Sequence, residues 1–197
     1  SDSRNVPAVE AFQAVDNEKI KKFVTNLGIK PEVDSTGYIH EAHALGAFNG
    51  ASPLQMAGAY AAFSNGGTYY EPYSVNKIIL RDSDEKITFK SEGERVMSEA
   101  TAYMVTDVLR DVPGRNSIPT LTSDQFAMKT GTTNYDDATA RKFGYSSDAA
   151  PDGWLVGYTP NISLAMWTGY VENKKGVYLT MSQMYYHKNN LYVACAK

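Results

Sequence analysis

Three strand-like runs in the second half of the chain restrict the folds that it can adopt. They are rich in apolar and small residues and cover residues 125–132, 153–159 and 162–170. Only Pro160 and Asn161 separate the last two runs, a connection that suits antiparallel neighbours. We therefore predict an antiparallel β-sheet flanked by helices from the first half of the chain, an α/β sandwich.

Four stretches carry helix signals, namely apolar residues at helical spacing with a cap residue before them and a glycine or proline after them. A capping box at Ser52 and Gln55 marks the clearest start. The predicted helices cover residues 6–15, 17–27, 52–63 and 98–109, with Asn5, Asn17, Ser52 and Ser98 as caps and Gly28 and Pro113-Gly114 as two of the stops. A hairpin is predicted over residues 73–89, and residues 29–49 and 134–151 are predicted to be irregular.

The composition argues against several classes of function. A chain of 197 residues with 43% apolar residues can form one domain with a core, and no linker divides it. The net charge of −3 without a basic stripe excludes nucleic acid as the expected partner. No apolar run approaches the roughly 18 residues of a membrane span. The single cysteine, Cys195, cannot form an intrachain disulfide.

The run from Lys129 to Thr133 offers the parts of a peptide-binding site. Gly131 has no side chain, so another chain can lie against the backbone there. Strand alternation places Thr130 and Thr132 on one face and Lys129 with Gly131 on the other. If this is an edge strand, its free backbone groups can pair with an extended peptide. The two hydroxyls and the lysine then suit a peptide that ends in a carboxylate.

A second short motif stands at the other end of the chain. Ser3-Arg4-Asn5 immediately precedes a predicted helix start, with Asn5 as the cap and Pro7 in the first turn. A cap residue that is fixed at a helix end can also face a cleft. The structural and the functional interpretation of Asn5 are therefore compatible.

Ser-x-Asn followed by Lys-Thr-Gly resembles the second and third motifs of the penicillin-binding proteins and serine β-lactamases. Three longer stretches make the chain most similar to the transpeptidase domain of class A penicillin-binding proteins. They are residues 50–63, residues 65–69, and residues 129–135 taken with 154–160. The resemblance runs from Ser3 to about Tyr170 and does not include residues 171–197.

The first motif of this family, Ser-x-x-Lys, carries the nucleophilic serine and precedes Ser-x-Asn. Two such strings occur here, Ser74 to Lys77 and Ser83 to Lys86, but both follow Ser3. They fall in a predicted strand and a predicted turn, whereas a serine activated by a lysine one turn on needs a helix. We therefore expect residues 1–197 to be the C-terminal part of one transpeptidase domain. The nucleophile, a glycosyltransferase domain and a membrane anchor are expected to lie outside this chain, which alone is expected to be inactive.

The resemblance implies a D-Ala-D-Ala transpeptidase that cross-links peptidoglycan stem peptides by serine acyl transfer. A serine attacks the D-Ala-D-Ala amide, and the acyl group passes to an acceptor amine on a neighbouring stem. β-Lactams are implied as covalent inhibitors that acylate the same serine. The location implied is the extracytoplasmic face of the bacterial cell membrane.

The same resemblance assigns roles to individual residues. Ser3 relays a proton to the leaving nitrogen, Lys129 polarises Ser3, and Asn5 positions the missing lysine and the substrate amide. Thr130 and Thr132 bind the terminal carboxylate beside Gly131, and the Thr132 backbone N–H supplies an oxyanion-hole donor.

Two other functions stay open. A serine β-lactamase has the same fold but needs a base for deacylation, and no glutamate stands in a recognisable β-lactamase motif. A non-catalytic penicillin-sensing domain would use the same binding residues. No cofactor or metal is expected, because His40 with His43 and Asp136 with Asp137 lack the further ligands of a metal site.

Overall fold

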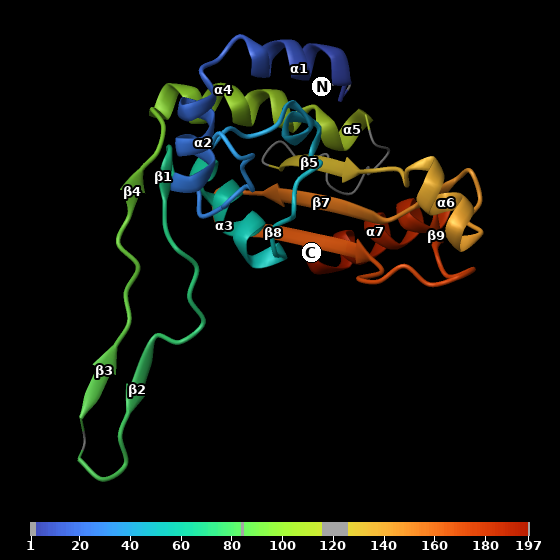
Figure 1. Ribbon diagram of the computed structural model, residues 1–197. Helices are drawn as coiled ribbons and strands as arrows, with labels where there is room; N and C mark the ends of the chain where they lie inside the picture. Colours follow the sequence, from blue (N-terminus) through green and yellow to red (C-terminus); the bar gives the residue numbers. More distant parts are fainter. Residues whose placement is uncertain (1–2, 84, 116–125, 197) are drawn as a thin grey trace.

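The computed structural model describes residues 3–83, 85–115 and 126–196, and its centre is a three-stranded antiparallel sheet (Figure 1). The strands are β5 (Ala127–Thr132), β7 (Asp152–Tyr158) and β8 (Ser163–Gly169), in the order β5-β7-β8. Among the described strands, β5 thus lies at an edge of this sheet and has one neighbour, β7. The three predicted strands and their antiparallel arrangement are confirmed.

Helices cover both faces of this sheet. Tyr158 of β7 stacks on Phe63 of α3 (Pro53–Ser64), whereas its neighbour Gly157 lies against Tyr192 of α7 (Met181–Ala196). Because successive residues of a strand point to opposite faces, α3 and α7 lie on opposite sides of the sheet. α4 (Glu99–Arg110) and α5 (Val112–Arg115) pack beside β5 (Figure 1). The predicted α/β sandwich is confirmed.

Two hydrophobic clusters hold these layers together. The first joins α5, β5, β7 and α7 and includes the fully buried Met128, Leu155 and Tyr192. The second joins the end of α2 (Asn17–Asn26) to α3 and α4 through Leu27 and Ala62. The first cluster therefore packs the sheet against α5 and α7. The second cluster packs α3, which itself contacts β7 and β8, against the end of α2 and against α4.

The helix starts confirm part of the predicted capping. Ser52 and Gln55 form a reciprocal capping box at the start of α3, and the Ser98 hydroxyl accepts the Thr101 backbone N–H at the start of α4. The predictions for the first two helices were wrong by one residue. Asn5 is the first residue of α1 (Asn5–Gln13), and Asp16 caps α2 instead of Asn17. The Asn17 amide instead exchanges two hydrogen bonds with the backbone of Ile39.

Three further expectations are corrected. Pro113 and Gly114 do not end α4 but lie within α5. The stretch predicted to be a loop between β5 and β7 contains α6 (Asp137–Phe143), capped by Asp136, and β6 (Ala149–Ala150), which pairs with β9 (Leu179–Thr180). Within residues 29–49 lies a short 3₁₀ helix, η1 (Glu41–Leu45).

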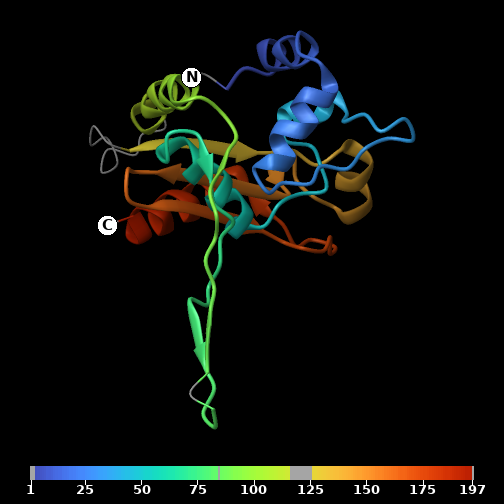
Figure 2. The ribbon, with the colours of Figure 1, turned by 90° about the vertical axis from the view of Figure 1, so that its left-hand side faces the viewer.

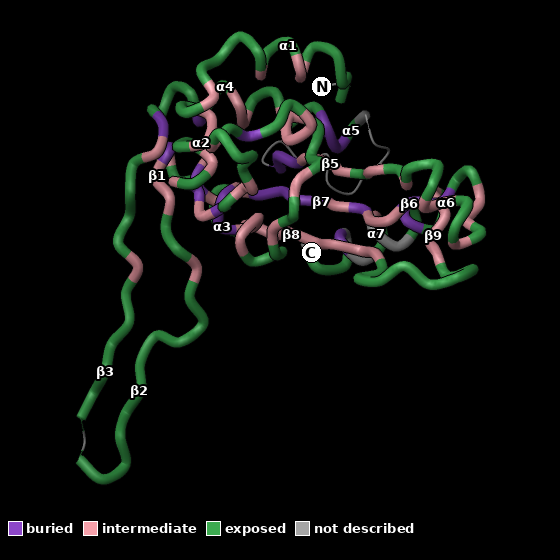
Figure 3. The backbone as a smooth tube through the Cα atoms, viewed as in Figure 1, coloured by how far each residue is buried: buried purple, intermediate pink, exposed green. Residues whose placement is uncertain are grey.

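The predicted hairpin forms a long arm, which we define as residues 70–93. β2 (Lys77–Ile79) pairs with β3 (Lys86–Thr88), and β1 (Thr68–Tyr69) pairs with β4 (Glu94–Arg95) where the arm joins the body. Figures 1 and 2 show the arm projecting away from the sheet and helices. Most of its described residues are exposed (Figure 3).

Candidate active site

Ser3 and Lys129 meet although 126 positions separate them. Lys129 Nζ donates a hydrogen bond of 2.8 Å to Ser3 Oγ, which confirms the predicted proximity of the two side chains. Ser3 has a φ of 52°, and among the described residues it is the one non-glycine residue with a positive φ. Such a backbone costs about 1–3 kcal/mol and is typical of functional sites.

The second hydrogen bond of Lys129 ties its ammonium to its own strand. Nζ also donates to the Thr130 carbonyl oxygen at 2.8 Å. Partial burial lowers the pKa of Lys129 below its ordinary value, because a poorly solvated ammonium is less stable than one in water. The lysine is thus held in place and releases its proton more readily than a surface lysine.

The strand register fixes which side chains of β5 share a face. Lys129 pairs with Val156 and Gly131 pairs with Trp154, and these β7 residues lie on the face covered by α3. Thr130 pairs with the fully buried Leu155, which lies on the α7 face. The predicted alternation is therefore present.

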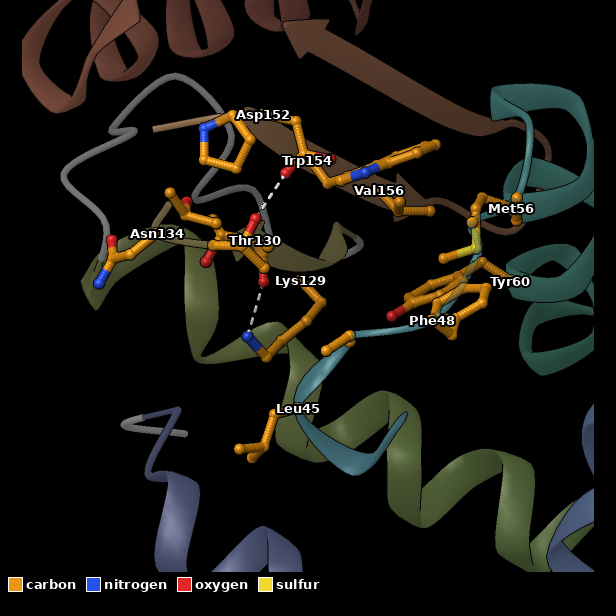
Figure 4. A pocket seen from close by; sticks show the side chains of 18 of the residues that line it. Leu45, Phe48, Met56, Tyr60, Lys129, Thr130, Asn134, Asp152, Trp154 and Val156 are labelled. Carbon is orange, nitrogen blue, oxygen red and sulfur yellow. Dashed lines mark hydrogen bonds between the residues drawn. The ribbon is translucent and has the colours of Figure 1, made fainter. Parts of the chain in front are cut away.

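A cleft of about 600 Å³ lies between this strand and the N-terminal half of the molecule (Figure 4). One wall is the continuous run from Lys129 to Asn134, so Thr130 and Thr132 line it as well as Lys129 and Gly131. The other walls are mainly apolar and come from the loop after η1, from α3 and from β7. They include Leu45, Phe48, Met56, Tyr60, Trp154 and Val156. Burial raises the pKa of Tyr60 to about 12, so its hydroxyl stays protonated.

The other predicted site residue, Asn5, occupies a different position. It is exposed, as the first residue of α1 two positions after Ser3. In the part of the chain that the structure describes, no hydrogen bond joins Asn5 to Lys129. The structure therefore brings Ser3 to Lys129 of β5 and places Asn5 at the start of α1, outside the residues that line the cleft.

Thr133 was given no individual role from the sequence alone, and Asp152 was not foreseen. The Thr133 hydroxyl donates to Asp152 Oδ1 at 3.0 Å, and both residues line the cleft (Figure 4). Strand alternation could have identified Thr133, which falls two positions after Gly131. No local pattern identifies Asp152, because its contact with Thr133 arises only from the pairing of β5 with β7.

Both Ser-x-x-Lys strings lie on the arm, which projects away from the central sheet (Figure 1). Lys77 opens β2 and Lys86 opens β3, and the Ser83 hydroxyl accepts the Glu85 backbone N–H in the turn. Neither serine sits on a helix with its lysine. This placement supports the expectation that neither is the nucleophile.

Both ring nitrogens of His43 lie near oxygen atoms of the protein. His43 Nδ1 lies 2.8 Å from the His40 carbonyl oxygen, and its Nε2 lies 3.4 Å from Glu32 Oε1. Across residues 3–83, 85–115 and 126–196, no three histidine, cysteine or acidic side chains come together as metal ligands would. Over the same residues, every helix is too short or too polar to cross a bilayer.

Comparisons with known proteins agree on one family. Residues 1–189 match the penicillin binding protein transpeptidase domain, so the match extends past Tyr170 into the region for which the sequence showed no resemblance. The chain is 41% identical over 179 residues to penicillin-binding protein 1A/1B of Bacillus subtilis, covering 88% of this chain and 19% of that protein. It is 42% identical over 180 residues to penicillin-binding protein 1A of Streptococcus pneumoniae, covering 85% and 24%. The chain thus spans about a fifth to a quarter of the length of these relatives.

Solved structures with the same fold include the D,D-transpeptidase domain of a peptidoglycan glycosyltransferase from Eggerthella lenta. Its TM-score is 0.66 at 19% identity, over 98% of this chain and 51% of that chain. Penicillin-binding protein 1A from Haemophilus influenzae has a TM-score of 0.64 at 20% identity, over 87% and 29%. At this level of identity the similarity concerns the fold, and it extends to all layers of the sandwich.

Proposed function

The chain belongs to the penicillin-binding protein transpeptidase family, and on this premise we propose that it forms the proton-relay and carboxylate-binding part of a D-Ala-D-Ala transpeptidase. The observation that carries the proposal is the 2.8 Å hydrogen bond from Lys129 to Ser3. It joins Ser3 of the Ser-x-Asn motif to Lys129 of the Lys-Thr-Gly motif, and Lys129 lines the cleft.

In this proposal a serine from a part of the protein outside these 197 residues attacks the carbonyl of the D-Ala-D-Ala bond. The serine oxygen gives up its proton and bonds to the carbonyl carbon, the amide C–N bond breaks, and D-alanine leaves with that proton on its nitrogen. Ser3 delivers that proton as the general acid. An amine of a neighbouring stem peptide then attacks the ester, regenerates the serine and completes the cross-link. A β-lactam acylates the same serine.

Lys129 supports the proposed reaction in three ways. Its donated hydrogen bond polarises the Ser3 hydroxyl, and its charge adds a positive potential for the substrate carboxylate. Its lowered pKa eases the return of a proton to Ser3 after each transfer. Asn5 positions the nucleophile's lysine and the substrate amide from the adjacent start of α1.

The edge of β5 supplies the binding site for the substrate. The Thr130 and Thr132 hydroxyls hold the terminal carboxylate at the rim of the cleft, and the Thr132 backbone N–H donates to the developing oxyanion. Gly131 lets the substrate backbone approach, because it carries no side chain on the face that it shares with Trp154.

The rival function of a β-lactamase needs a carboxylate that activates water for deacylation. Glu32 lines the cleft, but its carboxylate accepts the Asn49 backbone N–H at 2.8 Å. This bond, with a smaller contribution from His43, lowers the pKa of Glu32. A lowered pKa makes a carboxylate a weaker base, so Glu32 is a poor candidate for the base that a β-lactamase needs.

The setting proposed for this reaction is the outer face of the bacterial cell membrane, with the anchor outside these residues. The test uses the full-length protein incubated with penicillin and with a stem pentapeptide. We expect a penicillin adduct by mass spectrometry on a serine outside residues 1–197, and release of D-alanine from the peptide. The 197-residue chain alone should form no adduct.

Three other outcomes of this test would contradict the proposed function. Rapid turnover of penicillin without D-alanine release would identify a β-lactamase. A stable adduct without D-alanine release would identify a sensing domain. An adduct on Ser74 or Ser83 would contradict the assignment of the motifs.

A further inference from the structure

The carboxylate of Asp152 connects all three strands of the central sheet. Asp152 is the first residue of β7, and its Oδ1 accepts the Thr133 hydroxyl at 3.0 Å from the end of β5. Its Oδ2 accepts the indole N–H of Trp167 in β8 at 3.3 Å. One side chain on the middle strand therefore holds a residue of β8 and the residue that directly follows β5.

This connection lies where the backbone pairing of β5 stops. The last pair of the β5–β7 ladder is Thr132 with Gly153, so Thr133 lies one residue beyond it. β5 has one strand neighbour, and a strand end at an edge is held by fewer hydrogen bonds than one inside a sheet. The bond from Thr133 to Asp152 extends the attachment of β5 by one residue.

The residue immediately before Thr133 is the proposed oxyanion donor. The direction of the Thr132 N–H follows from the peptide plane between Gly131 and Thr132, and the Thr132 hydroxyl belongs to the proposed carboxylate site. Donors of this kind stabilise a transition state only when they are held in position before the reaction. The hydrogen bond from Thr133 to Asp152 therefore restricts the movement of Thr132, which carries both the N–H and the hydroxyl.

We propose that Asp152 is a positioning residue for acyl transfer, which acts through Thr133 to hold Thr132 in its reactive geometry. The inference rests on the proposed function of the Lys-Thr-Gly strand. It assigns no contact between Asp152 and the substrate. Both carboxylate oxygens already accept a hydrogen bond, so Asp152 acts as a fixed acceptor within the protein.

The experiment measures acylation of the full-length protein by penicillin under rapid mixing, which separates the dissociation constant of the initial complex from the acylation rate constant. Asp152→Ala and Thr133→Val should each lower the rate constant roughly tenfold or more, since small misplacements of catalytic groups have such effects. The dissociation constant of the initial complex should stay within about twofold of the wild-type value. The double variant should be no slower than the slower single variant, because both remove the same bond.

Two conservative variants show which bond matters. Asp152→Asn keeps an oxygen that can accept from Thr133 and should recover most of the rate lost in Asp152→Ala. Trp167→Phe removes the other bond of the carboxylate and should stay within about threefold of the wild-type rate. Asp136→Ala is the matched control, since it removes a carboxylate that caps α6 through Thr139 and makes no contact with β5 that the structure records.

A second measurement is independent of acylation. Hydrogen exchange of the same full-length variants should be faster in peptides covering residues 130–134 of Asp152→Ala and unchanged in that region of Asp136→Ala. A wild-type acylation rate in both Asp152→Ala and Thr133→Val, additive losses in the double variant, or unchanged exchange would overturn the inference. A wild-type protein that penicillin does not acylate, but whose exchange responds as expected, would instead refute the proposed function.

Discussion

Lys129 Nζ lies 2.8 Å from Ser3 Oγ, so the first described residue of the chain and the edge strand β5 share one hydrogen bond. The contact joins an exposed residue to a half-buried one. Its loss should therefore affect chemistry more than stability.

Replacing Ser3 with alanine tests this relationship in the full-length enzyme. Acylation by penicillin should fall by roughly 10²–10⁴, the usual range for a general acid. The melting temperature should change little, because the Ser3 side chain is exposed. Ser83→Ala, on the arm, is the control and should leave both quantities unchanged. Wild-type acylation by Ser3→Ala would remove Ser3 from the mechanism.

The lowered pKa of Lys129 predicts a pH dependence of acylation. If the protonated lysine attracts the substrate carboxylate, the rate constant should fall as the pH rises through the Lys129 pKa, below the ordinary value of 10.5. A pH profile between about pH 6 and pH 11 should show this alkaline limb, and Lys129→Arg should shift it upward. A limb at or above the ordinary lysine value would contradict the prediction.

The lowered pKa of Lys129 also determines how the free energy of unfolding changes with pH. The folded chain binds the Lys129 proton more weakly than the unfolded chain does, because burial lowers this pKa in the folded state. The contribution of Lys129 to the free energy of unfolding therefore increases as the pH rises from the folded-state pKa toward the unfolded one.

Thr130→Val and Thr132→Val test the proposed carboxylate site. Valine keeps the β-branched shape but removes the hydroxyl, and a hydrogen bond to a charged group is worth roughly 1.5–3 kcal/mol. Each variant should slow acylation by about one to two orders of magnitude at a nearly unchanged melting temperature. Thr88→Val, in β3 of the arm, should acylate normally. If both cleft variants match the wild type, the carboxylate is held elsewhere.

Gly157 provides a prediction about the core. A Cβ at this position would lie 2.6 Å from the Tyr192 hydroxyl and 2.8 Å from the Ala127 carbonyl oxygen. Gly157→Ala should therefore lower the free energy of unfolding by roughly 1–3 kcal/mol through overpacking. Gly114→Ala, where a Cβ meets nothing within 4 Å, should be neutral or slightly stabilising. Chemical denaturation of both variants measures the difference.

The parts of the fold that follow from local patterns were predictable. The strands around Lys129 and Trp154 and the capping box at Ser52 have signals within a few residues of themselves. α6 was missed because its seven residues are too few to show a helical period, and its Asp136 cap resembles a solvated acidic residue. Asn5 and Asn17 were misplaced by a single position, which lies within the ordinary variation of helix ends.

The candidate site was predictable only where the family resemblance connected residues that lie far apart in the sequence. No local pattern connects Ser3 with Lys129, and the family motifs supplied that pairing. Asp152 belongs to neither motif, and its role depends on the register between β5 and β7. Side-chain contacts of that kind are set by tertiary pairing, which a single sequence does not display.

The arm can be cut or altered without disturbing the residues that form the cleft. Its outer strands, β2 and β3, pair with each other, and it joins the body through β1 and β4 (Figure 2). A protease that cuts the exposed chain near Arg81 would therefore produce two fragments that stay associated, with the Ser3–Lys129 hydrogen bond intact. The same position could accept an inserted epitope or fluorophore, which would report on the protein without altering the residues of the cleft.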